Sequence, residues 1–478
     1  MSDVLPGEGN TNRPWLRGLR DKLGRSLLGR KLLLPKLLAC GLLFFVAIWL
    51  VNGTAPRPDA TGHPNVLFIS VDTLRADRLS IYGYERPTSP RLESFVREAT
   101  LFENARSHWP ATLQSHMSMF TSLFPRAHAV DRGRGVSESV PMLAEYFKHA
   151  GYRTAGFYSL SWLQKKYGFA RGYDDYGFRG KASNVQESAL EFIGPDASAK
   201  APFFLFFHIR EVHSGPGMEK EGKPLYPGPP KYRDAFLPHP EVEVEHLSMD
   251  IWRGNVRLNE KELANVRAQY DGGVLHADAI LEETFAELRQ RNAFDNTLIV
   301  ITSDHGEAIG DRGMFGHGNL WDEALHVPLL VKFPVDHPER EQWKGKRLNY
   351  PVQLIDLAPT ILRLVDLPQP EHYQGRDLFS EKPRDIMAQQ GENYVLIRDG
   401  YKLRWMTESD RLFLFNLGED PGELNDLSES ERDRANAMRE ALRFHLDAQR
   451  RYVPGVKQGK VELSAKDRKR LKSLGYLN

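Results

Sequence analysis

The sequence predicts an α/β fold whose central strands are parallel and buried, followed by a smaller α+β subdomain. Two observations predict it. Continuous apolar runs over residues 66–71, 203–209 and 297–302 are typical of strands buried on both faces, as in parallel sheets covered by helices. Segments with helical periodicity separate these runs, whereas short strands and turns follow after about residue 380.

The length, net charge and cysteine content of the chain limit the classes of protein to which it can belong. The 478 residues exceed what one hydrophobic core usually serves, so one large domain and a smaller one are expected. The net charge of +1 gives no bulk attraction to nucleic acid, and no nucleic-acid partner is expected. Cys40 is the single cysteine and lies in the apolar N-terminal segment, which excludes an internal disulfide and a thiolate site in the globular part.

The N-terminal segment has the pattern of a membrane anchor. Residues 1–31 are polar and basic, and residues 32–51 are apolar except for Pro35 and Lys36, over a length that spans a bilayer core. The basic flank is expected to stay in the cytoplasm, so that one transmembrane helix in the inner membrane leaves the catalytic domain in the periplasm or outside. A cleaved signal peptide is the alternative, which the long basic region disfavours. Residues 52–62 form a Pro/Gly linker.

A catalytic domain over residues 63–380 carries the α/β pattern. Its strands are expected at 66–71, 153–158, 203–209, 297–302 and 327–333, and its helices from Ser89 onward and over 112–121, 141–150, 259–292 and 354–365. Ser89 is the expected N-cap of its helix, with Pro90 at the first position. Residues 214–258 show no period and are rich in Pro, Gly and charge, which indicates a lid, a binding loop or disorder.

The last part of the chain, residues 381–478, is expected to form the α+β subdomain and a tail. Residues 394–405 predict a hairpin that turns at Asp399-Gly400, a dipeptide typical of two-residue hairpin turns. A strand is expected at 412–417 and a charged amphipathic helix at 428–450.

Polar residues follow the buried strands at their carboxyl ends. They are Asp72, His213, and the adjacent Asp304 and His305, with His317 twelve residues beyond His305. The ends of parallel strands converge on one rim, where open α/β sheets bind ligands. A carboxylate beside an imidazole is a common metal-ligand pair, although a loop-capping Asp and a hydrogen-bonded core His are the ordinary alternatives.

Thr112 stands at the start of a predicted helix, after a Trp-Pro turn. The plain interpretation is a helix N-cap, and the functional one is a hydroxyl nucleophile. A divalent ion bound by Asp72, Asp304 and His305 would lower the pKa of the hydroxyl and polarise a bound ester. The helix N-terminus behind Thr112 would also favour an anionic group.

Ordered motifs between residues 63 and 450 resemble the sulfatase family of the alkaline phosphatase superfamily. They lie at 64–75, 115–122, 203–213, 303–307 (Ser-Asp-His-Gly-Glu), 315–318 (Phe-Gly-His-Gly), 326–330, 356–360 and 415–425, and the segment 471–477 is also familiar from such chains. The resemblance implies an alkaline-phosphatase-like fold, a mostly parallel central sheet between helices, with a small sheet in the C-terminal subdomain. It also implies a metal-dependent enzyme that acts on sulfate or phosphate esters.

The chain departs from the family pattern at the reactive position. Family sulfatases carry Cys or Ser in Cys/Ser-x-Pro-x-Arg, and that residue is oxidised to formylglycine, whereas this chain has Thr112, with His116 in place of the Arg. A Thr side chain bears a methyl group on Cβ and cannot become that aldehyde. Thr73 replaces the second of two paired Asp residues, His317 replaces a Lys, and residues 158–162 replace a Gly-Lys-x-His segment.

Apart from these departures, the candidate site residues resemble the site of bacterial phosphoethanolamine transferases and lipoteichoic acid synthases. Those enzymes use a Thr nucleophile and bind one Zn or Mn. That similarity implies four metal ligands, namely Asp72, Thr112, Asp304 and His305. It implies that His213 and His317 bind phosphate or protonate the leaving group, and His116 joins them as an expected substrate-binding residue. Zn or Mn is expected rather than Ca or Mg, because Ca prefers six to eight oxygen ligands and this set includes an imidazole.

The leading functional hypothesis is a membrane-anchored metalloenzyme that hydrolyses or transfers phosphate esters through a covalent intermediate on Thr112, with His213 and His317 as further catalytic residues. One alternative is a sulfuric ester hydrolase that works without formylglycine, and another is a catalytically silent relative that binds a glycan or lipid. The expected substrate is an anionic ester on a lipid head group or a glycan. The membrane is the expected partner of the anchor.

Overall fold

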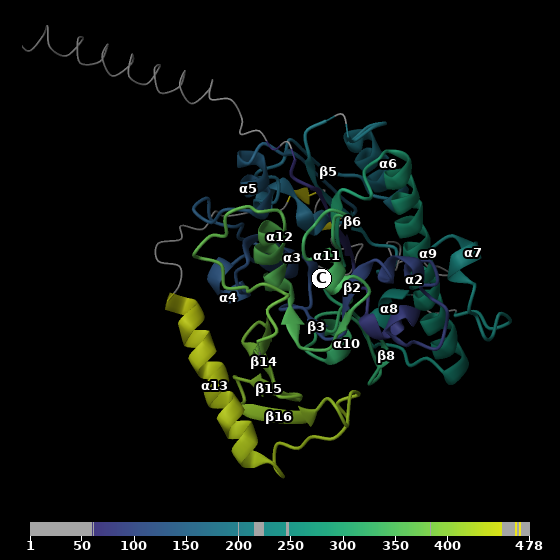
Figure 1. The fold of residues 1–478 in the computed structure, drawn as a ribbon. Helices are drawn as coiled ribbons and strands as arrows, with labels where there is room; N and C mark the ends of the chain where they lie inside the picture. Colours follow the sequence, from purple (N-terminus) through teal and green to yellow (C-terminus); the bar gives the residue numbers. More distant parts are fainter. Residues whose placement is uncertain are drawn as a thin grey trace, which may run out of the picture. The chain divides into compact units, whose positions relative to one another are not determined.

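The structure is a computed structural model that describes residues 60, 62–198, 200–214, 224–244, 248–382 and 384–451, together with 464, 465, 468 and 469. Residues 59–478 form one compact unit. The described part of this unit contains an eight-stranded sheet between two helical layers and a four-stranded sheet further along the chain (Figure 1).

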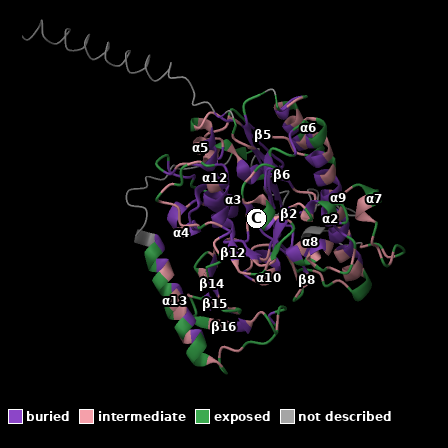
Figure 2. Cartoon of the chain, in the orientation of Figure 1, coloured by how far each residue is buried: buried purple, intermediate pink, exposed green. Residues whose placement is uncertain are grey.

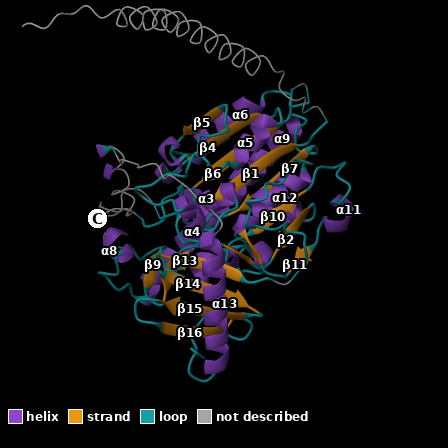
Figure 3. Cartoon of the chain, turned by 90° about the vertical axis from the view of Figure 1, so that its left-hand side faces the viewer, coloured by secondary structure: helices purple, strands orange, loops and turns teal. Residues whose placement is uncertain are grey.

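The eight-stranded sheet is mostly parallel. Its spatial order is β11 (Arg347–Leu348), β2 (Ala99–Phe102), β10 (Leu329–Lys332), β7 (Thr297–Thr302), β1 (Asn65–Val71), β6 (Phe203–Ile209), β4 (Arg153–Tyr158) and β5 (Asp175–Phe178). The strands from β7 to β5 run parallel to one another, whereas β10 pairs antiparallel with both β7 and β2. Figure 3 shows the strands side by side in this order. The predicted parallel sheet is therefore confirmed, with one strand reversed inside it.

Alternate side chains of the central strands face two different helical layers. Phe68 of β1 and Phe206 of β6 pack with α3 (Thr112–Thr121), α5 (Leu143–His149) and α12 (Leu357–Leu364). The next residues, Ile69 and Phe207, pack with α2 (Leu92–Val96), α6 (Ala182–Ile193) and α9 (Glu260–Gln290) on the opposite face. In Figure 2, β6 has the colour of buried residues and lies between α3 and α12 on one side and α6 and α9 on the other. Burial on both faces explains why the strand sequences are apolar without alternation.

Three neighbouring strands end at the same level. Ser70 of β1 aligns with His208 of β6 and with Thr302 of β7. The residues that follow these strands therefore meet at one edge of the sheet, as the ends of parallel strands do. Asp72 leaves β1 at this edge, and Asp304 leaves β7 there.

Shorter elements link the main ones. They are the 3₁₀ turns Ala76–Arg78, Ser80–Tyr82, Ser161–Leu163, Lys165–Tyr167 and Leu354–Asp356, the helices α4 (Pro125–His128), α7 (Pro230–Arg233), α8 (Ser248–Trp252), α10 (Asp322–Leu325) and α11 (Arg340–Trp343), and the strand pairs β3 (Ala105–Arg106) with β12 (Val352–Gln353) and β8 (Ala308–Asp311) with β9 (Met314–Gly316). The predicted loop at 214–258 thus contains two short helices, α7 and α8. Residues 215–223 and 245–247 of that loop lie outside the described residues.

The C-terminal subdomain is an antiparallel meander of β13 (Ile386–Gln390), β14 (Asn393–Arg398), β15 (Tyr401–Met406) and β16 (Arg411–Asn416). The helix α13 (Arg432–Arg451) packs across one face, where Leu396 and Leu403 contact Met438 and Leu442 (Figure 3). The other face packs against the segment around α10 of the larger domain. The predicted hairpin turn at Asp399-Gly400 is present, with positive φ at both residues.

One predicted helix start is wrong. The helix α2 begins at Leu92 rather than at Pro90, and its N-cap residue is Arg91. Asp278 of α9 supplies the cap from a distance, because its carboxylate accepts from the main-chain N–H groups of Arg91 and Leu92 at 3.1 and 2.9 Å. The hydroxyl of Ser89 instead accepts from the N–H of Ile81 at 3.2 Å. A neighbouring helix has thus taken over the role that the local pattern assigns to Ser89.

The predicted fold also needs a correction at its N-terminal end. It included a transmembrane helix at residues 32–51, and a search of the described residues finds no helix with the length and apolar character needed to cross a membrane. Residues 1–59, which include the predicted anchor, lie outside the described residues. The membrane anchor therefore has no support from the structure.

Candidate metal and ester site

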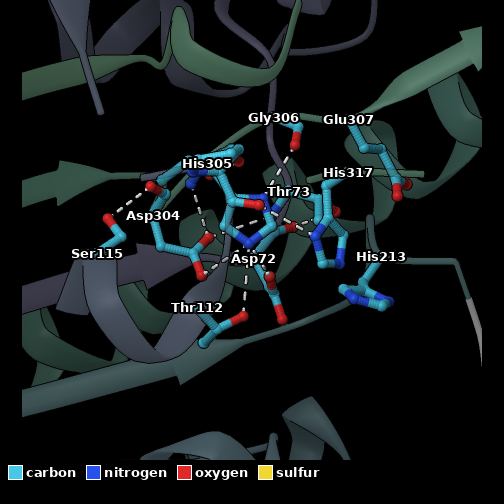
Figure 4. Close-up of polar contacts among 12 residues, drawn as sticks. Asp72, Thr73, Thr112, Ser115, His213, Asp304, His305, Gly306, Glu307 and His317 are labelled. Carbon is cyan, nitrogen blue, oxygen red and sulfur yellow. Dashed lines mark hydrogen bonds and ion pairs between the residues drawn. The ribbon is translucent and has the colours of Figure 1, made fainter. Parts of the chain in front are cut away.

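Four side chains from three parts of the chain meet at the edge of the sheet. Asp72 follows β1, Asp304 and His305 follow β7, and Thr112 is the first residue of α3. All four are fully buried. Figure 4 shows them pointing toward one another. The structure therefore brings together the whole set of metal ligands expected from the sequence.

The imidazole of His305 lies at the centre of the group. Its Nε2 atom is 3.4 Å from Oγ1 of Thr112, 3.5 Å from Oδ2 of Asp304 and 3.8 Å from Oδ1 of Asp72. Its Nδ1 atom donates to the main-chain oxygen of Gly306 at 2.9 Å, which leaves the lone pair of Nε2 facing the two carboxylates. Separations of this size suit donor atoms that share one cation, because zinc bonds of about 2.1 Å set their donors roughly 3 to 4 Å apart.

The hydrogen bonding of the two carboxylates, those of Asp72 and Asp304, also suits the binding of a cation. Within the described residues, neither oxygen of Asp72 nor Oδ2 of Asp304 has a hydrogen-bond partner. Burial raises the pKa of Asp72, and the negative charges of Asp304 and Glu307 raise it further. Burial also raises the pKa of Asp304. Buried carboxylates without partners are costly unless a cation neutralises them, so this set is suited to a divalent ion.

The main chain around Thr73 holds Asp304 in place. Thr73 has a φ of 58°, which is rare for a β-branched residue and marks a strained turn. The turn aims its N–H at Oδ1 of Asp304, at 3.3 Å, and Tyr270 donates to its carbonyl oxygen at 2.8 Å. Ser107 and Ser115 both donate to the main-chain oxygen of Asp304, at 2.6 and 2.7 Å. The conformation that directs Oδ2 toward His305 is therefore fixed from several sides.

Gly306 lies where the exit from β7 passes close to another segment. Its N–H donates to the main-chain oxygen of Ala324 at 3.0 Å. A Cβ atom at this position would lie only 2.1 Å from the main-chain oxygen of Glu323. Only glycine fits here without moving one of the two segments.

We therefore expect Gly306→Ala to lower the free energy of unfolding by about 1–3 kcal/mol, the usual cost of overpacking. Urea unfolding of the purified protein measures it. Gly418→Ala is a matched control, since its added Cβ would make only an ordinary contact, at 3.5 Å from Oδ1 of Asn416. Equal stability of the two variants would contradict the close packing at Gly306.

Arg75 joins the exit of β1 to the loop after His305. Its guanidinium donates to Oδ2 of Asp311 at 2.7 Å and to the main-chain oxygen of Glu307 at 3.1 Å. Burial by itself would raise the pKa of Asp311, but the charge and hydrogen bonds of Arg75 outweigh it and lower this pKa to about 2. The ion pair therefore stabilises the loop that follows the metal ligands.

Asp311→Asn is expected to lower the free energy of unfolding at neutral pH by about 2 kcal/mol, which corresponds to the pKa shift from 3.8 to about 2. Because the folded-state pKa is the lower one, this stabilisation is present above about pH 4 and is lost as the pH falls toward 2. Urea unfolding of both proteins across this range measures the difference. A difference that does not shrink below pH 4 would refute this explanation.

His213 and His317 lie beside the metal ligands, on the opposite side of His305 from Ser115 in Figure 4. The ring of His317 is 4.5 Å from that of His305, and the ring of His213 is 5.6 Å from that of His317. Each donates from Nδ1 to a main-chain oxygen, that of Ser214 for His213 and that of Pro110 for His317. Burial lowers the pKa of both imidazoles well below 6.5, so both are neutral at pH 7 before an anion binds.

A pocket of about 300 Å³ opens above Thr112. Its lining includes Thr112 and His317, the exposed guanidinium of Arg132, and three indole and two amide side chains, those of Trp109, Trp162, Trp252, Gln114 and Gln390. Thr112 itself is not the helix N-cap, since that position belongs to Ala111. The hydroxyl of Thr112 is therefore free of the capping role and lies between the pocket and the metal ligands.

His116 and His208 lie beneath this pocket and do not line it. His116 is fully buried, 3.0 Å from Oγ of Ser70 and 3.6 Å from Oδ2 of Asp304. His208 was not among the predicted site residues, although its Nε2 is 3.9 Å from Oδ2 of Asp72. The signal that identifies it is a single imidazole inside the otherwise apolar strand β6.

The sulfatase family model matches residues 64–367, more than half of the chain. The chain belongs to the sulfatase family. This sulfatase is 26% identical to the arylsulfatase of Clostridium perfringens over 479 residues, covering 82% of this chain and 97% of that relative. It is 24% identical to arylsulfatase K of Gallus gallus over 468 residues, covering 82% and 84% of the two chains.

Solved structures share the fold of this sulfatase. One is an enzyme in complex with its substrate D-glucosamine-2-N,6-O-disulfate, with a TM-score of 0.65, 16% identity and coverage of 82% of this chain and 98% of that one. Another is a phosphonate monoester hydrolase from Silicibacter pomeroyi, with a TM-score of 0.62, 19% identity and coverage of 82% and 96%. At these identities the likeness shows the fold alone.

Family membership confirms the predicted family and the predicted enzyme class. The protein is an ester hydrolase of the sulfatase family, whose enzymes are metal-dependent, and its buried group of Asp72, Asp304 and His305 could hold a metal ion. The alternative of a catalytically silent binding protein is set aside. The metal, the nucleophile and the ester remain predictions.

Proposed function

We propose that this sulfatase-family enzyme hydrolyses phosphate esters through a covalent intermediate on Thr112. The observation that supports it best is the position of Thr112, which lines the pocket and whose Oγ1 lies 3.4 Å from Nε2 of His305. An oxygen nucleophile must reach both the ester and an activating group, and Thr112 borders both.

In the first step, Thr112 reacts as the alkoxide, its proton having been released to solvent, and Oγ1 forms a bond to phosphorus while the bond to the ester oxygen breaks. Asp72, Asp304 and His305 would hold a divalent cation, which would lower the pKa of the Thr112 hydroxyl and stabilise charge on the transferring group. The N-terminus of α3, which begins at Thr112 and runs for ten residues, adds main-chain N–H groups that favour an anion. The leaving oxygen takes up a proton as it departs.

His213 and His317 are placed to handle that proton. Their Nδ1 hydrogens are engaged by main-chain oxygens, so Nε2 is the position that gains and loses a proton in each. A dianionic ester bound nearby raises the pKa of both imidazoles, because an opposite charge favours the protonated form. One of them then donates to the leaving oxygen and afterwards accepts a proton from the water that hydrolyses the phospho-threonine.

Two features favour phosphate over sulfate esters. A Thr side chain cannot form the aldehyde hydrate by which formylglycine sulfatases release their sulfated intermediate. A phosphate monoester carries more negative charge than a sulfate ester, and a divalent cation stabilises that charge during transfer. The second candidate, hydrolysis of sulfate esters without formylglycine, is favoured by the relatives that are named arylsulfatases.

The pocket above Thr112 suggests the class of leaving group. Indole faces pack on flat or ring-shaped groups, amide side chains hydrogen-bond to hydroxyls, and Arg132 can pair with a further anionic group. A sugar ring fits these contacts better than an alkyl chain. An anionic glycan ester is therefore the proposed substrate class, in keeping with the glucosamine derivative bound by the related structure.

The proposed metal is Zn or Mn. The ligand set combines carboxylate oxygens with an imidazole nitrogen, which borderline ions accept, whereas calcium prefers six to eight oxygen ligands. Elemental analysis of the purified protein and recovery of activity after chelation test this choice. Recovery with calcium alone would contradict it.

A metal-supplemented comparison of aryl phosphate monoesters, aryl phosphate diesters and aryl sulfates tests the proposed ester. The proposal predicts a higher kcat/KM for a phosphate ester than for every sulfate tried. Faster turnover of aryl sulfates by the wild-type enzyme would instead establish the second candidate.

A further inference from the structure

We infer that the cavity beside His213 is a second anion-binding subsite, in which Arg210 and Lys181 hold a further anionic group of the same substrate. The cavity has a volume of about 570 Å³, and all three residues line it. The group it would take is a carboxylate, sulfate or phosphate on the glycan ester, since each of these pairs with a guanidinium. The inference rests on the proposed function only for the position of the ester, and it adds a second charge to the substrate.

This second cavity reaches the candidate site at His213. The ring of His213 lies 5.6 Å from that of His317, which lines the pocket above Thr112. Figure 4 shows the two imidazoles next to each other, beside the proposed metal ligands. The two cavities thus border the same pair of imidazoles, which places the second one within reach of a substrate whose ester is at Thr112.

The end of β6 fixes the position of Arg210. Arg210 is the first residue after this strand, and its main-chain oxygen accepts from the N–H of His213 at 3.1 Å, so one turn holds the two residues together. The preceding main-chain oxygen, that of Ile209, accepts from the N–H of Asp72 at 2.8 Å. Arg210 is thereby anchored at the edge of the sheet that carries the candidate site.

The guanidinium of Arg210 forms no hydrogen bond or ion pair within the described part of the chain, where its hydrogen bonds come from the main chain alone. The adjacent carboxylate of Glu211 instead accepts from main-chain N–H groups, those of Arg210 at 3.2 Å and Ala182 at 3.3 Å. A half-buried cation without a close counterion is unfavourable unless an anion joins it. Arg210 is therefore available to an oxyanion, to which a guanidinium can donate two parallel hydrogen bonds.

The other titratable groups of the lining leave the charge of Arg210 in place. His276 is neutral at pH 7, because burial and the charge of Lys231 lower its pKa to about 4. The side chains of Lys181 and Glu283 are both exposed, so water screens their charges. The flexible ammonium of Lys181 can still turn to a bound anion, which gives the cavity a second cation for this group.

The test compares the affinities of two series of inert probes. The series from ethylene to hexylene bisphosphonate is titrated by calorimetry into the full-length protein, equilibrated with Mn or Zn, and alkyl monophosphonates of equal length are the reference. We expect at least one bisphosphonate to bind about tenfold or more tightly than its monophosphonate, because its second phosphonate gains a charge-assisted pair with Arg210.

Variants assign this gain in affinity to the second cavity. The gain should be lost in Arg210→Gln and reduced in Lys181→Gln. The matched control is Arg97→Gln, which should keep the gain, because Arg97 is the exposed C-cap residue of α2 and does not line the cavity. Arg132→Gln changes the cation of the other pocket and should also keep it. A gain that is lost in Arg132→Gln and kept in Arg210→Gln would overturn the subsite.

A wild-type protein that binds every bisphosphonate no better than its monophosphonate would refute the subsite without any variant. If Arg210→Gln does not fold, Lys181→Gln decides, and an undiminished gain in that variant would contradict the inference. Turnover of aryl phosphates by the same preparation tests the proposed function separately. Turnover without a gain in affinity overturns the subsite alone, whereas a gain without turnover of any phosphate ester overturns the proposed function and leaves the anion subsite standing.

Discussion

Replacing Thr112 with alanine is expected to lower kcat/KM by about 10³-fold or more, because the proposed covalent mechanism then lacks its nucleophile. Thr112 lines the pocket beside His305, and among the described residues that line this pocket it carries the only aliphatic hydroxyl. Steady-state kinetics on the best aryl phosphate measure the loss. Thr112→Ser should retain part of the turnover, since it keeps the oxygen.

Thr121→Ala is the matched control for this loss. Thr121 is a second fully buried threonine of α3, and its hydroxyl donates to the main-chain oxygen of Met117 at 2.7 Å, away from the site. Thr121→Ala should affect stability and leave kcat near that of wild type. Near-wild-type turnover in Thr112→Ala, with the fold intact, would refute the nucleophile.

Replacing Asp304 with alanine is expected to remove bound metal and to lower kcat/KM by about 10³-fold or more. The side chain provides Oδ2 to the group of Asp72 and His305, and Oδ1 accepts from the N–H of Thr73. Elemental analysis and kinetics measure the two effects together. A variant that keeps its metal and its turnover would contradict the assigned ligand.

The double variant Thr112→Ala with Asp304→Ala sharpens this test. A nucleophile and the metal that activates it act as one unit, so the double variant should be little worse than either single one. Losses that multiply would show that the two residues act in separate steps. In that case Asp304 would have a role other than activating Thr112.

The central strands could be predicted from the sequence because burial on both faces makes them apolar throughout. The predicted run 203–209 matches β6, and 297–302 matches β7, while β1 extends one residue further than predicted. The short β2 was missed, since its four residues carry no turn signals of their own. The reversed direction of β10 also could not be predicted, because pairing depends on contacts that are distant in sequence.

The site could be predicted where strand ends determine it. Asp72 and Asp304 meet because β1 and β7 are adjacent and end at the same level. The sequence does not show how deep each side chain lies beneath the pocket. His116 was expected to bind substrate, yet its position on α3 turns it toward Ser70 beneath the pocket. His208 was overlooked because a strand pattern does not show that its side chain faces two carboxylates.

The most direct test of the account is to trap the intermediate on Thr112. The enzyme is mixed with an aryl phosphate monoester, quenched in acid within the first turnovers, digested, and analysed by mass spectrometry. The account predicts one phosphoryl group on the peptide that contains Thr112, and none in Thr112→Ala. Full turnover of the phosphate ester without any phosphorylated peptide, or with the phosphoryl group on another residue, would contradict it.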